Sequence, residues 1–272
     1  MSKIFHYTTI DTLALIMLNK TIRFNRLDNV DDTEESKYGS GSYNTILNKY
    51  VFVSCWTKNP AENIDLWKRY ANEGKGIRIA MDEDMFVSYQ NYSVLGSKFK
   101  SYFPNKFYVT GDCLFVDVNN EIMLYDVEYV ENVEMHTKKL IEQNRDYINY
   151  YIPKVGIYKN RDKWEQQGES RFRIFAFPLT IKEAKNLNME NVNDVCKAFD
   201  IAQYLLTNNH PINLTHYDMS IKKEAIDSIE IMMGPNTTAE DKAKVQRILY
   251  PCYINRFFSK RKITDSSIKI TK

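Results

Sequence analysis

The residues best suited to chemistry are the amide and the acid in the segment Gln167-x-Glu169-x-Arg171. They precede an aromatic, β-prone run that extends to Phe177, so a strand is expected to begin here. Side chains two apart on a strand point to the same face, which would place Gln167 beside Glu169. An amide and a carboxylate held together at a strand mouth can serve one another in catalysis. The alternative is a solvated strand edge, on which Glu169 and Arg171 form an exposed ion pair worth about 0–1 kcal/mol.

A second group of polar residues is the acidic segment Asp31-Asp32-Thr33-Glu34-Glu35. Clustered carboxylates suit hard cations, but the spacing of an EF-hand does not follow, and a solvated loop is the expected structure. His136, His210 and His216 have no ligand-like spacing with one another or with the cysteines. We therefore predict no metal.

Two stretches interleave cations with aromatic rings, the pairing with which proteins track phosphates and stack bases. They are residues 98–108 and the segment from Arg256 to Lys262. The alternatives are a hairpin with one buried face for the first and a solvated terminal helix for the second. No Walker loop, GxGxxG or GxSxG motif occurs, so P-loop, Rossmann and hydrolase-elbow folds have no support.

Composition limits the classes of protein further. The chain has 272 residues, with 37 basic and 35 acidic side chains, and the net charge of +2 argues against a generic nucleic-acid coating protein. No apolar run approaches the roughly 18–20 residues that span a bilayer, and the amino terminus lacks the pattern of a secretory signal. The four cysteines are scattered and form no CxxC pair, which fits a reducing compartment. We expect a cytoplasmic protein.

The elements that must position these residues can be read from hydrophobic periodicity. Strands are expected over residues 3–8, 21–24, 50–56, 77–81, 171–177 and 225–233, the last ending at Gly234. Helices are expected after a cap at Thr9 or Asp11, and over about 62–72, 134–150, 182–208 and 238–249. Trp67 is assigned to the core. Residues from about 84 to 160 and from 182 to 215 are interpreted as insertions in one elaborated α+β domain that spans residues 1–272.

Several blocks together resemble a bacterial family of unassigned function, the domain-of-unknown-function family 2971. They run in order over nearly the whole chain: His6-Tyr7-Thr8, the acidic loop 31–35, Ser54-Cys55-Trp56, Leu66-Trp67-Lys68-Arg69-Tyr70-Ala71, Gly74-Lys75-Gly76, Trp164 with Glu169 and Arg171, and Ile229-Glu230-Ile231 before Gly234-Pro235. The chain departs from the family pattern in two places. The usual Asn-Asp-Pro loop is Asp31-Asp32-Thr33, and the acid often found two before the glutamate is Gln167.

The order of these blocks is in turn similar to the ADP-ribosyltransferase superfamily of the His-Tyr-Glu type. Its members carry a His on the first strand, a Tyr on a helix after a central strand, and a Glu opening a later strand. The matching positions are His6, Tyr70 and Glu169. The resemblance implies a split mixed or antiparallel sheet core with helical and hairpin insertions. It also implies NAD as the substrate.

The resemblance further implies roles for the acid and the amide. Breaking the nicotinamide–ribose bond of NAD develops positive charge on the ribose, as in glycoside cleavage. Glu169 would stabilise this oxocarbenium-like ribose and hold its 2′-hydroxyl. Gln167 would orient the acceptor nucleophile, and its alternative is a turn residue before Gly168. Both would be catalytic residues.

Five further residues would bind the cofactor. His6 would contact the ribose hydroxyls from the end of the first strand, within the block that includes Tyr7 and Thr8. Tyr70 would stack on the nicotinamide ring, and Ser54 would line the pocket beside it. The alternatives are a structural histidine and simple core packing. We expect His6, Tyr70 and Glu169 to line one cleft.

The leading hypothesis is therefore an NAD-dependent ADP-ribosyltransferase or NAD-cleaving enzyme, of the kind used as a toxin or in antiphage defence. Its acceptor, protein or nucleic acid, is left open, and an antitoxin or other regulatory partner would accompany such an effector. The toxin role is an analogy, because fold does not fix function. The alternatives are a non-catalytic binding or sensing domain with the same fold and a nucleic-acid-binding module.

Overall fold

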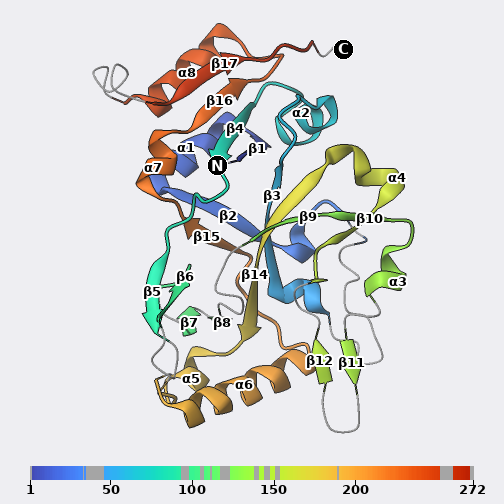
Figure 1. Cartoon of the computed structure of the whole chain (residues 1–272), viewed down its shortest axis with the longest axis vertical. Helices are drawn as coiled ribbons and strands as arrows, with labels where there is room; N and C mark the ends of the chain where they lie inside the picture. Colours follow the sequence, from blue (N-terminus) through green and yellow to red (C-terminus); the bar gives the residue numbers. More distant parts are fainter. Residues whose placement is uncertain are drawn as a thin grey trace.

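The computed structural model describes residues 2–32, 34, 46–92, 98–104, 107–110, 112–116, 123–137, 141–143, 148–150, 154–188, 190–251 and 260–269. Within these ranges the chain forms an α+β protein around a large sheet of mixed strand direction (Figure 1). Its strands are β1 (Lys3–Thr8), β2 (Thr21–Arg26), β3 (Val51–Thr57), β4 (Ile77–Asp82), β7 (Phe107–Thr110), β8 (Cys113–Val116), β9 (Leu124–Asp126), β14 (Glu169–Pro178), β15 (His216–Ser220), β16 (Glu230–Met233) and β17 (Lys262–Asp265).

The main path through the sheet is β17-β16-β4-β1-β3-β14-β8-β7, with β2 and β15 branching from β3 and β9 from β14. Most pairs are antiparallel, whereas β16 and β17 are parallel. Three smaller pairs join β5 (Tyr89–Tyr92) to β6 (Lys98–Ser101), β10 (Glu128–Val130) to β13 (Tyr158–Asn160), and β11 (Ile141–Gln143) to β12 (Ile148–Tyr150).

The helices surround this sheet at both ends. They are α1 (Ile10–Asn19), α2 (Ile64–Tyr70), α3 (Val133–Thr137), α4 (Arg161–Trp164), α5 (Ile181–Ala184), α6 (Val192–Thr207), α7 (Lys223–Asp227) and α8 (Ala239–Leu249), with 3₁₀ turns η1 (Leu27–Asn29), η3 (Leu47–Tyr50) and η6 (Glu165–Gln167). Figure 1 shows α1, α2 and α8 around the upper half and α6 below the lower end of β14. None of the described helices is long and apolar enough to cross a membrane.

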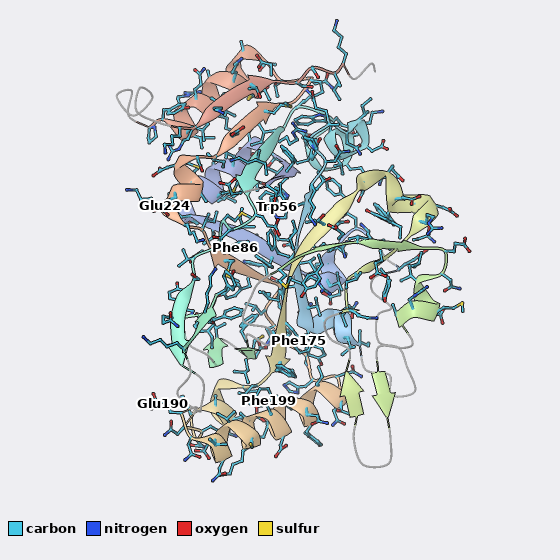
Figure 2. The ribbon with its side chains drawn as sticks, in the orientation of Figure 1. Trp56, Phe86, Phe175, Glu190, Phe199 and Glu224 are labelled. Carbon is cyan, nitrogen blue, oxygen red and sulfur yellow. The ribbon has the colours of Figure 1, made fainter. Side chains whose placement is uncertain are left out.

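The centre of the fold is the pair β3 and β14, which are in register from Thr57 opposite Glu169 to Val51 opposite Phe175. Both strands are buried along most of their length, as their apolar runs require. Figure 2 shows Trp56 in the upper half of the molecule, and Phe175 in the lower half above Phe199 of α6. The core is therefore continuous along this pair, and the pair fixes the position of everything attached to either end.

The opposite edge of β3 is shared by two strands, and the sheet splits between them. β1 meets this edge at Phe5 opposite Thr57, whereas β2 meets it at Asn25 opposite Val53. Between these two points, residues 54–56 of β3 have no register partner on this edge within the described ranges. The split leaves room for a cavity against β3 between its pairings with β1 and β2.

Most of the predicted elements are confirmed. The strands over 3–8, 21–24, 50–56, 77–81 and 171–177 are present, and Thr9 caps α1 through a hydrogen bond from the Thr12 main chain. Thr238 caps α8 in a capping box with Asp241. Helix α2 ends before a turn in which Gly74 has φ +78°. Trp67 is fully buried, as predicted.

Three predictions of secondary structure are wrong. The helix over 134–150 is only α3, followed by β11 and β12, whose Ile and Tyr side chains favour strands. The helix over 182–208 is two helices, because the Asn191 side chain accepts from two main-chain amides and starts α6 anew. The strand over 225–233 begins as helix α7 and becomes β16 only at Glu230.

Segments within both predicted insertions pair with or pack against the main sheet. Within the first, from about 84 to 160, β8 and β9 both pair with β14 and so belong to the main sheet. Within the second, 182–215, Ala198 of α6 packs with Leu114 and Leu179 at the lower end of the sheet.

Candidate functional site

A cavity of about 540 Å³ lies along the split in the sheet. Small-molecule sites typically have volumes of about 300–1,000 Å³, so the cavity is large enough for a ligand of that class. It is lined by residues of β1, β2, β3, α1, α2 and β14, together with the segment 29–32. Every predicted site residue lies on its wall: His6, Tyr7, Thr8, Ser54, Tyr70, Gln167 and Glu169.

Glu169 is the centre of a buried ion triad. Its carboxylate accepts from Arg171 Nε at 2.5 Å and Nη2 at 3.2 Å, and from Lys159 Nζ at 2.8 Å. All three side chains are at most 7% exposed. The alternative interpretation, an exposed Glu169–Arg171 ion pair, is therefore wrong in one respect: the pair exists, but it is buried. The triad has two cations and one carboxylate, so it carries a net charge of +1.

The carboxylate of Glu169 is ionised despite its burial. Burial by itself raises its pKa, but the charges of Arg171 and Lys159 and the hydrogen bond from Arg171 outweigh this and hold the pKa at about 2. The neighbouring Cys55 thiol responds in the opposite sense, because burial and the charge of Glu169 both raise its pKa. The site therefore presents a fixed carboxylate and a protonated, unreactive thiol.

The main chain of Glu169 is held as firmly as its side chain. The Tyr129 hydroxyl accepts from the Glu169 amide at 2.8 Å, and the Val127 amide donates to the Glu169 carbonyl at 2.9 Å. Thr57, opposite Glu169 in register, donates from its hydroxyl to the carbonyl of Gly168. The start of β14 is therefore anchored from both sides.

Gln167 reaches the cavity in a different way from the one predicted. It lies in η6, outside the strand, and Gly168 in the left-handed conformation (φ +52°) separates it from Glu169. Strand alternation therefore does not apply to this pair. Gln167 is nevertheless buried, and its Nε2 donates to the Tyr70 hydroxyl at 3.3 Å. This bond joins η6 to helix α2 across the cavity wall.

His6 bridges the split itself. Its Nδ1 lies 2.8 Å from the carbonyl oxygen of Cys55, which can only accept, so Nδ1 carries the proton and Nε2 is left as an acceptor. Burial lowers the pKa of His6, which keeps the ring neutral near pH 7. The ring also packs on Trp56, with centroids 5.1 Å apart. A side chain thus takes the place of a missing strand neighbour at this point of β3.

The other predicted binding residues are already committed to structural contacts. The Tyr7 hydroxyl accepts from the Asn63 amide, and its ring packs edge-on against Trp67 at 4.8 Å. The Ser54 hydroxyl accepts from Trp56 Nε1 at 3.0 Å. Thr8 is buried at the end of β1. These residues shape the wall, and none presents a polar group as clearly as His6 and Glu169 do.

Asn63 positions the helix that carries Tyr70, and sequence reasoning missed it. Its side-chain oxygen accepts from the amides of Asp65 and Leu66, which caps α2. Its side-chain nitrogen donates to the carbonyl of Gln166 at 2.7 Å, and its own amide donates to Tyr7. A single residue therefore connects α2, η6 and β1. An Asn before an amphipathic helix indicates an N-cap, but no pattern in the sequence indicates the hydrogen bonds of Asn63 to Gln166 and Tyr7.

Lys159 and Arg171 are the other residues whose place in the site was not predicted. Arg171 was interpreted as a partner of Glu169, but its position on the cavity wall was not foreseen. Lys159 is ten residues before Glu169 and reaches it because β13 pairs with β10 beside the start of β14. Its ammonium also lies 4.3 Å from the centroid of Trp164. No local pattern in the sequence indicates this contact.

The segment 31–35, predicted to be a solvated loop, is only partly exposed to solvent within its described residues. Asp31 is exposed, but Asp32 is buried and also lines the cavity. Glu34 forms an ion pair with Lys163 of α4, which brings the segment next to that helix. Thr33 and Glu35 lie outside the described residues. Within the described ranges, no three His, Cys, Asp or Glu side chains are grouped as metal ligands.

The basic and aromatic stretch at 98–108 is divided between two strand pairs, because β6 pairs with β5 and β7 pairs with β8. It is therefore not the single hairpin given as the alternative. Tyr102 and Phe103 are buried, and Phe103 stacks on Phe115 at 5.2 Å. Lys100 is exposed and pairs with Asp84. The rings of Tyr102 and Phe103 therefore belong to the core. In the second stretch, residues 256–259 lie outside the described residues.

The fold and the cavity define an α+β protein with a ligand-sized site in the split of its sheet. Comparisons with family models, with curated proteins and with solved structures found no match. The resemblances to family 2971 and to the ADP-ribosyltransferases therefore stay predictions.

Proposed function

We propose that this cavity binds NAD and that the protein transfers ADP-ribose from it to a macromolecular acceptor or to water. The observation that carries the proposal is that His6, Tyr70 and Glu169, which are far apart in the sequence, line one cavity. Gln167 joins them through its bond to Tyr70. The same resemblance that pairs these residues implies NAD as their substrate.

In this reaction the bond between ribose C1′ and the nicotinamide nitrogen breaks. Both bonding electrons leave with nitrogen, so nicotinamide departs as a neutral molecule and the ribose becomes oxocarbenium-like. An acceptor oxygen or nitrogen then forms a bond to C1′ and releases its proton to water. With water as the acceptor, the same steps hydrolyse NAD.

The groups on the wall suit these charge changes. Glu169 is ionised, as required of a carboxylate that stabilises positive charge on the ribose. Neutral His6 keeps Nε2 as an acceptor for a ribose hydroxyl. Tyr70 supplies an aromatic face for the flat nicotinamide ring, and Gln167 beside it would orient the acceptor.

A second candidate function is binding without turnover. The observation that favours it is the triad, because Arg171 and Lys159 offset the negative charge of Glu169. A site with a net charge of +1 suits an anionic nucleotide, whereas stabilisation of a cationic ribose is weaker when two cations are in contact with the carboxylate. This candidate predicts NAD affinity with no release of nicotinamide.

The test is to incubate the protein with NAD labelled in the nicotinamide and the adenylate halves. We expect release of nicotinamide and transfer of the adenylate label, both lost in Glu169→Gln. The matched control is Glu165→Gln, because Glu165 is four residues away and its side chain is 59% exposed. Circular dichroism must show that both variants are folded. Binding of NAD by the wild type without nicotinamide release, across protein, DNA and RNA acceptors, would favour the binding module. Absence of binding would refute both candidates.

A further inference from the structure

Asp32 is a buried acid that the reaction described above does not use. The residue is 5% exposed and lines the cavity together with Asn29 and Val30. Its Oδ1 accepts from the Glu34 amide at 2.9 Å. Its Oδ2 is buried and has no hydrogen-bond donor within the described part of the chain. Asp32 therefore has one carboxylate oxygen committed to the loop and one with no partner.

Burying a carboxylate oxygen without a donor is costly, and such groups in native proteins usually have a partner. The bond from the Glu34 amide occupies Oδ1 and leaves Oδ2 as an acceptor without a donor within the described part of the chain. Because Asp32 lines the cavity, a ligand there can bring a donor to Oδ2.

We propose that Asp32 is a ligand-binding residue that accepts a hydrogen bond from an O–H or N–H group of the dinucleotide. The inference rests on the proposed function for the identity of the ligand. The diphosphate of the ligand is excluded as the group that contacts Asp32, because a carboxylate repels it. The donors that remain are the ribose hydroxyls, the carboxamide nitrogen and the adenine amine. Asp32 is thus a determinant of specificity for the riboside or base portion of the ligand.

The sharpest variant is Asp32→Asn, which keeps the Oδ1 acceptor and replaces Oδ2 with an NH₂ donor. Calorimetry with NAD should show an affinity about ten- to a hundredfold lower than that of the wild type, the usual loss for a hydrogen bond to a charged group. The thermal midpoint of the ligand-free protein should be unchanged or higher, because the variant removes the charge from a buried oxygen that has no hydrogen-bond donor within the described part of the chain. The matched control is Asp162→Asn, which removes the same charge from an exposed position of α4 outside the cavity wall.

Analogues of NAD identify the partner group. The analogues are the carboxylate form of the nicotinamide ring, the deoxyribose forms and the form with hypoxanthine in place of adenine, so that each possible donor is removed in turn. We expect one of them to bind the wild type more weakly while binding Asp32→Asn with no further loss, since the shared hydrogen bond is already absent. If no analogue behaves in this way, Asp32 does not contact the ligand.

The other outcomes are also decisive. Equal NAD affinity of Asp32→Asn and the wild type would overturn the inference and leave the proposed function intact. A lower thermal midpoint together with equal affinity would mean that an ordered water or the loop itself satisfies Oδ2. If the wild type does not bind NAD at all, the proposed function falls first and the inference falls with it.

Discussion

Replacing Glu169 by glutamine should destabilise the protein by an amount that depends on pH. Glutamine has nearly the shape of a protonated glutamate, so the variant loses mainly the charge that Arg171 and Lys159 bind. The pKa of this carboxyl falls from 4.5 to about 2 on folding. Since each pKa unit corresponds to about 1.36 kcal/mol, the ionised form contributes about 3 kcal/mol. Removing one partner of a buried ion pair costs about 3–5 kcal/mol, which agrees.

The sign of the pH dependence follows from the direction of the shift. A carboxyl whose pKa is lowered by folding stabilises the protein fully above its unfolded value, near 4.5, and this contribution is lost as the pH falls through about 2. The difference in unfolding free energy between wild type and Glu169→Gln should therefore be about 3 kcal/mol at pH 7. At pH 3 it should be less than half of that.

The assay is urea unfolding of both proteins between pH 7 and pH 3, followed by tryptophan fluorescence. Glu165→Gln is the control, and because Glu165 is exposed it should change the unfolding free energy by less than about 1 kcal/mol at every pH. A Glu169→Gln effect below about 1 kcal/mol at pH 7, or one that stays constant down to pH 3, would refute the argument that the triad is a stabilising buried ion cluster.

Four further substitutions test the fold around the site and at α8, and each can be checked by thermal unfolding. Gly76→Ala should lower the free energy of unfolding by at least about 3 kcal/mol, because the new Cβ would lie 2.3 Å from a main-chain oxygen of β1. Gly168→Ala should lower it by only about 1–2 kcal/mol. Its left-handed φ is unfavourable for alanine, but the nearest atom to the new Cβ is 3.8 Å away. His6→Leu should cost about 1–3 kcal/mol by leaving the Cys55 carbonyl without its donor, and a stabilised variant would contradict the proposed bridge. Thr238→Ala should cost about 1 kcal/mol through loss of the capping box, and no change would mean that α8 is held by packing alone.

The sequence predicted the strands of the centre well because their residues carry the signal themselves. The apolar runs of β3 and β14 and the cap at Thr9 are local features, and they appear where expected. The grouping of His6, Tyr70 and Glu169 came from the resemblance, and all three lie on one cavity. The roles assigned to them stay predictions.

The features that could not be predicted from the sequence depend on contacts between residues that are distant along the chain. Lys159 is buried against Glu169 at the start of β14, and Asp32 is buried in the wall of a cavity formed by several distant elements. The segment 225–233 has the composition of a strand, but Ala225 and Ile226 are buried on helix α7. In each case tertiary contacts overrode what the local pattern indicated.

The pairing of β4 with β16 has a consequence for the order in which the protein can form during synthesis. β1 and β4 are made early, but the free edge of β4 has no partner until Glu230–Met233 has been synthesised. Contacts between segments so far apart in sequence form slowly, and an exposed strand edge can meanwhile pair with other chains. Glu62 lies in the loop before α2 and accepts hydrogen bonds from the hydroxyls of Ser266 and Ser267, which joins residues 266 and 267 to that loop. The half of the cavity that holds His6 and Tyr70 therefore gains these contacts only after residues 230–267 have been synthesised.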